Sequence, residues 1–295
     1  MTPDLQHRIL FASDGSRSSD GAMTTALEFP WPSSAKARAV VASSSANWLP
    51  TASEHVRAAI EASFEATASA ARSTLTQRWP DAAAVVINAP AGKAILAEAA
   101  RFDASVIVLG WRGHGVFRRL LVGSVSRHIA ENAPCPVLVV RDPVKPVRCF
   151  VVGLDSSTNA GRALDFLASL TPTPDSRVVL VDVIEPARAP GSINRLPKSL
   201  RMHIRAEIDA MNEEQQRDAQ ARVAGGAARL ARAGWQVQTE VMVGAPLASL
   251  MKAYAQHRGD VLVLGARAIS GAERWLLGSV ANGALNRAPA VLLVS

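Results

Sequence analysis

The chain has 295 residues, of which 48% are hydrophobic and 5% aromatic, a composition typical of a globular protein with room for two ordinary domains. Its net charge of +7 is spread evenly: residues 1–145 carry 15 Lys and Arg against 12 Asp and Glu, and residues 146–295 carry 17 against 13. These features indicate no nucleic-acid surface, which would need clustered Arg with interleaved aromatic residues, and no membrane span.

The cysteines and the N-terminal sequence indicate a cytoplasmic protein. Cys135 and Cys149 each adjoin an apolar run, so we expect two reduced core residues rather than a disulfide. The first residues show no apolar run behind a basic start, so we expect no export signal.

Short apolar runs and helical segments alternate through the first half of the chain. The expected strands cover residues 8–12, 39–42, 84–88, 106–109 and 137–140, and the expected helices cover 18–28, 52–78, 90–100 and a segment beginning at Ser124. This alternation predicts a parallel sheet, because right-handed crossovers place the helices on both of its faces.

The second half repeats the first. Residues 261–294 match residues 106–140 with a shift of 155 residues and no gap, which indicates a duplication. We expect domains at 1–142 and 148–295, joined by a short linker stiffened by proline. The second copy has expected strands at 150–154, 178–183, 237–243 and 291–294, helices at 200–233 and 246–256, and an exposed insertion at 185–199.

The predicted fold class is α/β, with two tandem, doubly wound, parallel five-stranded sheets of strand order 3-2-1-4-5. The last strand of each sheet is an apolar edge with unpaired N–H and C=O groups, and the linked copy offers the same edge. We therefore expect residues 137–140 and 291–294 to meet near a local two-fold axis and form an intrachain pseudo-dimer. A homodimer of the whole chain remains open.

A glycine-punctuated loop follows the fourth strand. Gly110 ends the strand, Gly113 follows, and Gly123-Ser124 opens the next helix. Glycines let backbone N–H groups approach an anion, and a helix N-terminus adds free donors and the positive end of the dipole. The loop is therefore a candidate phosphate site.

The same edge of the sheet carries a carboxylate. In an open parallel sheet, ligands bind at the carboxyl ends of strands where neighbouring crossovers part, which places Asp14, after strand one, across from Gly110. A carboxylate accepts hydrogen bonds from an exocyclic amine or a ribose hydroxyl. Together the two features predict a nucleotide site, with adenine favoured by its amine.

The spacing Gly-x2-Gly-x9-Gly-Ser resembles the nucleotide loop of the universal stress protein family, and the chain resembles a tandem member with the adenine-nucleotide alpha-hydrolase-like fold. The resemblance implies ATP, with or without Mg²⁺, as the ligand. It implies Asp14 at the base end, the loop near Ser43 and Ser44 beside the adenine, and Gly110, Gly113, Gly123, Ser124 and Val125 at the ribose and phosphates. Arg112, His114, Arg118 and Arg119 are candidate phosphate contacts, although charged loop residues are more often solvated.

The second copy departs from this pattern. It keeps Asp155, Gly265 and Gly278-Ser279, with Val280 next, but has Ala268 and Ile269 where the first copy has Gly113 and His114. A Cβ at a position of positive φ costs about 1 kcal/mol and crowds the phosphates. We expect a second, weaker site.

Simpler interpretations of the same residues stay open. Asp14 could be only a helix N-cap, and the glycine loop only a tight turn. Other chemistries lack their motifs: the chain has no G-x-x-x-x-G-K-[ST], no G-x-G-x-x-G after the first strand, no G-x-S-x-G and no Cys or His pair with metal-ligand spacing. We therefore assign no catalytic residue and no metal ligand.

The sequence favours an ATP-binding regulatory or stress-response protein that acts on an unknown protein partner or on its own association. Phosphoryl transfer needs positioned metal and water, so we expect at most a weak ATPase. One alternative is an adenine-nucleotide-dependent hydrolase or transferase. The other is an interaction protein without a nucleotide.

Overall fold

The computed structural model describes residues 7–43, 53–112, 122–266 and 277–295, which form ten strands in one sheet. The strands of the first copy are β1 (Arg8–Ser13), β2 (Lys36–Ala42), β3 (Ala83–Ile87), β4 (Val106–Gly110) and β5 (Val137–Val140). Those of the second copy are β6 (Cys149–Leu154), β7 (Arg177–Ile184), β8 (Gln236–Val243), β9 (Val261–Gly265) and β10 (Ala290–Val294). Their spatial order is β3-β2-β1-β4-β5-β10-β9-β6-β7-β8.

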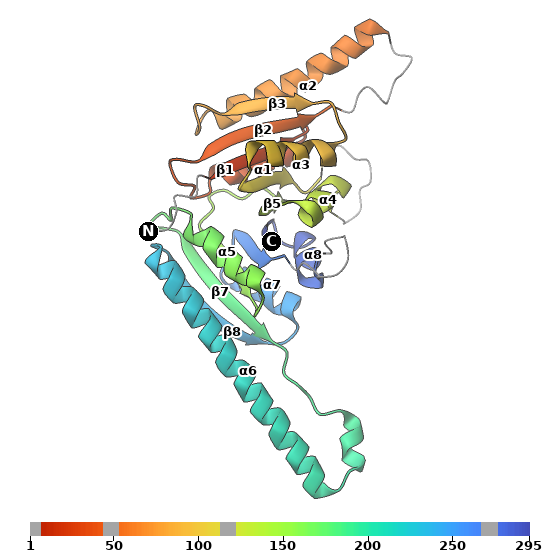
Figure 1. Cartoon of the computed structure of the whole chain (residues 1–295). Coiled ribbons are helices and arrows are strands. Elements are labelled where there is room, and N and C mark those ends of the chain that lie inside the picture. The colour runs from red at the N-terminus through yellow and green to blue at the C-terminus, as the bar shows by residue number, and fades with distance from the viewer. Residues whose placement is uncertain (1–6, 44–52, 113–121, 267–276) are drawn as a thin grey trace.

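Each half of the sheet is parallel, and the halves meet through one antiparallel pair (Figure 1). β5 pairs with β10 so that Val140 faces Ala290 and Val137 faces Leu293. Both predictions are confirmed: the strand order within each copy, and the meeting of the two fifth strands as an intrachain pseudo-dimer.

Helices cover both faces of the sheet, as the alternation of strands and helices predicts. The first face carries α1 (Arg17–Leu27), α2 (Glu54–Leu75), α5 (Thr158–Ala168) and α6 (Lys198–Arg232). The second carries α3 (Ala91–Phe102), α4 (Ser124–Asn132), α7 (Pro246–Gln256) and α8 (Ser279–Leu285). Strand side chains alternate between the two cores, so that Ile9 and Phe11 pack on the first and Leu10 on the second.

An aromatic cluster joins the two copies on the first face. Phe29 and Trp31 of the first copy stack with ring centroids 5.2 Å apart, and Phe29 meets Phe150 of the second copy edge-on at 5.4 Å. His7 is buried beside Trp31 and Phe166, and its Nε2 lies 3.2 Å from the carbonyl oxygen of Ser169. Because the cluster draws on both copies, each half completes the core of the other.

Polar contacts also cross the seam, beside β5 and β10. The Val122 amide donates to Oδ1 of Asn286 at 3.1 Å, and Arg127 donates to Oδ1 of Asn282 at 3.1 Å. Val122 immediately precedes the start of α4, so the second copy holds the end of the first copy's loop.

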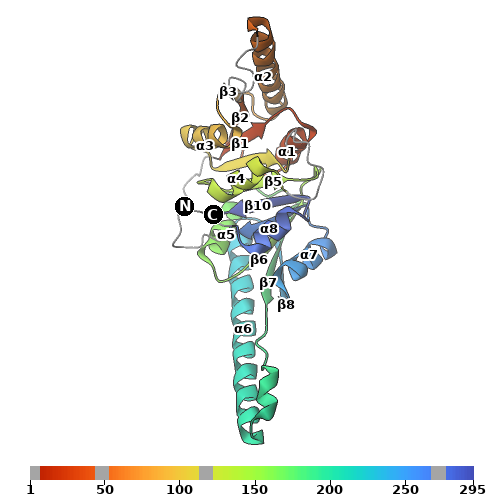
Figure 2. The same ribbon diagram turned by 90° about the vertical axis from the view of Figure 1, so that its right-hand side faces the viewer.

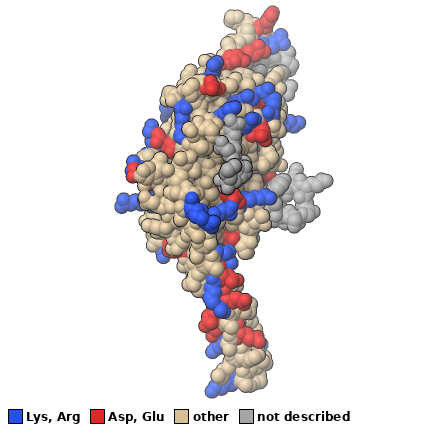
Figure 3. Space-filling model, turned by 60° about the vertical axis from the view of Figure 1, so that its left-hand side comes forward, with Lys and Arg blue, Asp and Glu red and all other residues tan. Residues whose placement is uncertain are grey.

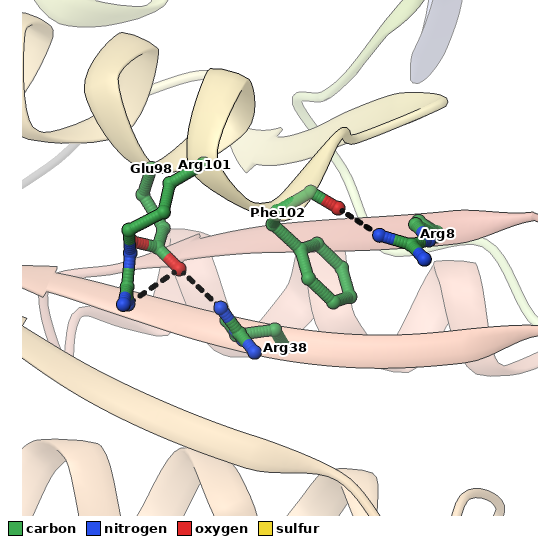
Figure 4. A network of polar contacts seen from close by, with 5 residues as sticks. All are labelled: Arg8, Arg38, Glu98, Arg101 and Phe102. Carbon is green, nitrogen blue, oxygen red and sulfur yellow. Dashed lines mark hydrogen bonds and ion pairs between the residues drawn. The ribbon is translucent and has the colours of Figure 1, made fainter.

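A buried carboxylate ties α3 to the sheet (Figure 4). Glu98 of α3 accepts from Arg38 of β2 and from Arg101, each at 2.7 Å. Arg38 also lies over the ring of Phe102, 4.4 Å from its centroid. Burial acts to raise the pKa of Glu98, but the hydrogen bonds and charges of the two arginines outweigh it and lower the pKa.

Cys135 and Cys149 are both buried and free, as the sequence predicts. Burial raises the pKa of the Cys135 thiol to about 12. None of the helices in the described ranges is long and apolar enough to cross a membrane.

Candidate nucleotide site

Two strand ends and one helix start meet at a cavity in the first copy. The cavity has a volume of about 120 Å³. Asp14 after β1, Gly110 at the end of β4, Arg112, and Val125 in the first turn of α4 all line it. The structure therefore brings together the carboxylate and the end of strand four, which lie 96 residues apart in the sequence.

Asp14 is not the cap of the following helix. The N-cap of α1 is Ser16, whose Oγ accepts from the amide of Ser19 at 3.3 Å. Asp14 accepts from the Ser16 amide at 3.0 Å, which forms an Asx turn, and Gly15 between them has a φ of 71°. This turn holds the Asp14 side chain at the rim of the cavity.

Gly110 has a packing role of its own. A Cβ at this position would lie 2.6 Å from the backbone carbonyl carbon of Ser18, because α1 crosses the end of β4 at close range. At Gly265 of the second copy, a Cβ would likewise lie 2.9 Å from the amide nitrogen of Ala160. Both glycines are thus required by helix packing, independently of any ligand.

The start of α4 offers free backbone donors. Gly123 is its N-cap and makes no side-chain cap, whereas α1 and α5 begin with the capping serines Ser16 and Ser157. The Gly123 amide donates to the Trp111 carbonyl at 2.9 Å, so the donors left for an anion are the first-turn amides that begin with the exposed Ser124.

Ser126 is a cavity residue that the sequence analysis missed. It is buried, and its Oγ donates to the carbonyl oxygen of Gly110 at 2.7 Å, which ties α4 to the end of β4. Its only sequence signal is a serine on the inner side of a short helix, and the second copy has Ala281 at the matching position.

Arg112 lines the cavity, and its guanidinium carbon lies over the Trp111 ring, 4.2 Å from the ring centroid. Its amide donates to Oγ of Ser18 at 3.3 Å. The remaining predicted contacts of the first copy, Ser44, Gly113, His114, Arg118 and Arg119, lie outside the described residues, as do Ala268 and Ile269 of the second copy.

The second copy has the larger cavity, about 350 Å³, lined by all five of its predicted site residues. These are Asp155, Gly265, Gly278, Ser279 and Val280. Glu185, which follows β7, also lines it and was not predicted. The start of α8, with Gly278 as N-cap, again lacks a side-chain cap.

An ion pair distinguishes the second copy from the first. Asp182 of β7 is 2% exposed and accepts from Arg222 of α6 at 2.8 Å. The hydrogen bond to Asp182 raises the pKa of Arg222, and the charge of Asp155 acts in the same direction. Asp182 pairs with Leu154 just as Val41 pairs with Ser13, so the first copy has an apolar residue at this position.

The geometry suits a ligand with a donor-rich end and an anionic end. A cavity of about 120 Å³ is small for a ligand pocket, so a ligand larger than one ring system would extend beyond it. Within the described parts of the chain, no group of three or more His, Cys, Asp and Glu side chains could hold a metal ion.

Comparisons with protein families and with individual proteins point to the same family. The model of the universal stress protein family matches residues 6–141 and 147–295. A universal stress protein of Thermus aquaticus is 41% identical over 58 residues, 20% of this chain and 42% of that protein. A Mycobacterium bovis universal stress protein is 37% identical over 65 residues, 21% of this chain and 20% of that protein. The chain thus matches less than half the length of these relatives.

Solved structures share the fold across the whole chain. A universal stress protein from Archaeoglobus fulgidus has a TM-score of 0.68 at 16% identity, covering 98% of this chain and 96% of that one. A functionally unknown protein from Pseudomonas aeruginosa PAO1 has a TM-score of 0.57 at 13% identity, covering 99% and 93%. At these identities the likeness concerns the fold alone.

Proposed function

Because the chain belongs to the universal stress protein family and carries two copies of its domain, we propose that the first copy binds ATP and that ATP occupancy regulates a protein partner or self-association. One observation carries the proposal. A single cavity is lined by a carboxylate, Asp14, and by Val125 in the first turn of α4, a helix whose start is left uncapped.

Each part of the site suits one part of the nucleotide. Asp14 accepts hydrogen bonds from the adenine amine or the ribose hydroxyls. The first-turn amides of α4, with the positive end of the helix dipole, bind the phosphates. Arg112 adds positive charge at the mouth, and Mg²⁺, if it accompanies ATP, is held by the phosphates themselves.

The site supports binding better than hydrolysis. Phosphoryl transfer requires a residue that positions the attacking water and groups that neutralise charge on the transferred phosphate. Among the described cavity residues, Asp14 is the only carboxylate, and it is assigned to the base end. We expect phosphate release to be slow or absent.

Two features bear on the second copy. Its cavity is the larger one, which favours a ligand there. The positive charge of Arg222, whose guanidinium is hydrogen-bonded to Asp182, opposes it, because that charge already interacts favourably with the Asp155 carboxylate that a ligand amine would use. We keep the expectation of a weaker second site and attribute it both to Ala268 and Ile269 and to this arginine.

Calorimetric titration with ATP of the variants Ser124→Glu and Ser279→Glu tests the assignment. A glutamate in the first turn of a helix favours the helix dipole, so the fold is preserved, but its charge repels phosphate. We expect Ser124→Glu to weaken the tight site at least about tenfold, roughly 1.4 kcal/mol, and the matched Ser279→Glu to leave it nearly unchanged.

A second pair of variants addresses the base end. Asp14→Ala removes the tight site, whereas Asp155→Ala has little effect on it. If Ser124→Glu binds ATP as the parent does, the site is misplaced, and if the parent takes up no ATP at all, the proposal itself fails.

Two other functions remain as alternatives to ATP-dependent regulation. An adenine-nucleotide-dependent hydrolase or transferase would release phosphate or consume ATP on a turnover timescale. A nucleotide-free interaction protein would release no adenine nucleotide when the purified protein is denatured and the released small molecules are analysed by mass spectrometry.

A further inference from the structure

The distal half of α6 projects from the body of the second copy (Figures 1 and 2). The buried residues of this 35-residue helix are Ala219, Val223, Gly226 and Leu230, all in its second half. Residues 198–215, called the arm below, therefore extend over about 27 Å, at 1.5 Å per residue, without packing on the sheet.

One side of the arm is already occupied by its own chain. Residues 185–197 run back along it and include a 3-10 helix, Gly191–Arg195, in which Ile193 is buried. The Ala187 amide donates to Oδ1 of Asn212 at 2.8 Å, and Nδ2 of Asn212 donates back to the Ala187 carbonyl at 3.1 Å. These contacts brace the arm, which reduces the entropy lost when a partner binds it.

Another side carries an exposed stripe at helical spacing. Residues three or four apart lie on the same face of a helix, and the stripe has intervals of four, three, four and four. Its members, all exposed, are Lys198, Met202, Arg205, Asp209 and Glu213. Met202 is 62% exposed, the second largest exposure among the large apolar residues of the described chain.

The charges of the stripe are ordered along the helix, two basic residues before two acidic ones. Figure 3 shows that both basic and acidic side chains are exposed on the arm. Within the described residues, none of these four side chains forms an ion pair. The polar side-chain contact that the described arm does contain joins Nε2 of His203 to Glu207 at 3.2 Å, and both of these residues lie outside the stripe.

We propose that two copies of the chain associate by antiparallel pairing of this stripe. A two-fold axis near Ala206 puts Lys198 of one arm opposite Glu213 of the other and Arg205 opposite Asp209, and each of these pairs occurs twice. Each Met202 lies four residues from the axis, about 6 Å along the helix, and packs against the region of Ala210 on the other arm. The proposal concerns a surface outside the cavities and does not depend on nucleotide binding.

The order of charges along the stripe favours an antiparallel second copy of the chain over other partners. Parallel pairing would set like charges opposite each other, and a polyanion or a membrane surface would attract one half of the stripe and repel the other. Only a partner with the reverse order satisfies both halves, and an antiparallel copy of the same arm has that order. Two single helices make a small interface, so the dimer is weak and weakens as salt screens its charges.

Sedimentation equilibrium of the full chain measures the association. At about 0.05 M salt the parent forms dimers as its concentration approaches about 500 µM, and the dimer weakens at least about tenfold at 0.5 M salt. A parent that remains monomeric throughout this range at low salt overturns the proposal.

Charge reversal tests whether the stripe itself forms the interface. The variant Asp209→Lys with Glu213→Lys has an entirely basic stripe, and Lys198→Glu with Arg205→Glu has an entirely acidic one. Each alone is expected to be monomeric, because like charges meet, while an equimolar mixture of the two forms a heterodimer tighter than the parent dimer.

A matched control keeps the result specific. Glu207→Lys with Glu214→Lys makes the same change in net charge as the basic stripe variant, on the same arm but on the far side of the helix from the stripe. The control should dimerise like the parent, and circular dichroism should show equal helix content in all variants. If the control loses the dimer as completely as the stripe variants do, or if the mixture stays monomeric, the stripe is not the interface.

Discussion

Gly110 is the point at which α1 comes closest to the sheet. A Cβ at Gly110 would lie 2.6 Å from the backbone of the neighbouring helix, and a Cβ at Gly265 would lie 2.9 Å from it. Both distances are too short for a side chain, so only glycine fits at either position. The sequence predicts a site at these positions because glycines recur at a family spacing, but it does not reveal that packing alone requires the first glycine of each loop. The donors that matter for an anion lie further on, in the first turns of α4 and α8.

Single residues at the site were predictable where a pattern marked them and not otherwise. Asp14 follows an apolar strand, and that position placed it correctly at the cavity. Ser126 has no pattern of its own. Asp182 did carry a signal, an acid inside the apolar run of β7, but its partner Arg222 lies 40 residues away on a helix whose facing side the sequence does not fix.

His7 predicts a pH dependence of stability. Burial lowers its pKa below the ordinary 6.5, and the hydrogen bond with the Ser169 carbonyl opposes this only in part. As the pH falls through 6.5, the unfolded chain therefore takes up a proton before the folded chain does, and stability decreases. Urea unfolding at about pH 7.5 and about pH 5.5 should show a larger loss for the parent than for His7→Phe. Equal losses would contradict the assignment.

At the scale of elements, α3 forms a wall of the first cavity through Ala91 and Ile95, and Glu98 fixes this helix on β2. Removing one partner of a buried ion pair leaves the other charge uncompensated. We expect Glu98→Gln to lower the free energy of unfolding by about 3 kcal/mol. Arg101→Ala, which removes an exposed partner, should cost much less. Chemical denaturation of the two variants measures the difference.

The Glu98 carboxylate also makes the free energy of unfolding depend on pH in the acidic range. The arginines hold the pKa of Glu98 below its unfolded value of 4.5, so its contribution is complete above that pH and is lost as the pH falls towards the folded pKa. In Glu98→Gln this loss is absent. A parent and variant with parallel profiles between about pH 6 and about pH 3 would show that Glu98 is not the group responsible.

The strands and most helices were predicted to within a few residues, because apolar runs and their punctuation are local signals. The segment 185–199 was expected to be an exposed insertion, and most of its residues are exposed. The structure adds a 3-10 helix, Gly191–Arg195, and the burial of Ile193. The segment is rich in proline and arginine, and its packing depends on the long helix that follows, so no local pattern could indicate the contact.

At the scale of the whole molecule, the interface between the two copies contains side chains that differ between the copies and complement each other. Arg127 and Asn282 occupy the same position in their respective copies, four residues after Gly123 and Gly278, and they hydrogen-bond to each other at 3.1 Å. We expect Asn282→Arg to set two guanidinium groups face to face and lower the melting temperature, and the exchange Arg127→Asn with Asn282→Arg to restore it. A double variant no more stable than Asn282→Arg alone would show that the loss arises elsewhere.

The meeting of β5 with β10 followed from the repeat and from the need to cover an apolar edge, whereas the strand order was taken from the doubly wound fold class. The aromatic cluster that joins the copies did not, because its members come from the ends of elements throughout the chain. The relative size of the two cavities was also beyond the sequence, since it depends on how side chains from five or more elements fill the space between strands and helices.

The single sheet that runs through both copies has a consequence for how the two halves can diverge. Because they are covalently linked, the pairing of β5 with β10 is intramolecular and does not weaken on dilution, as that of two separate subunits would. In a dimer of identical subunits every substitution occurs twice and must suit both sides of the axis. Here it occurs once, so one half can keep a helix of 22 residues while the other extends its counterpart to 35 and acquires a function that the first half does not share.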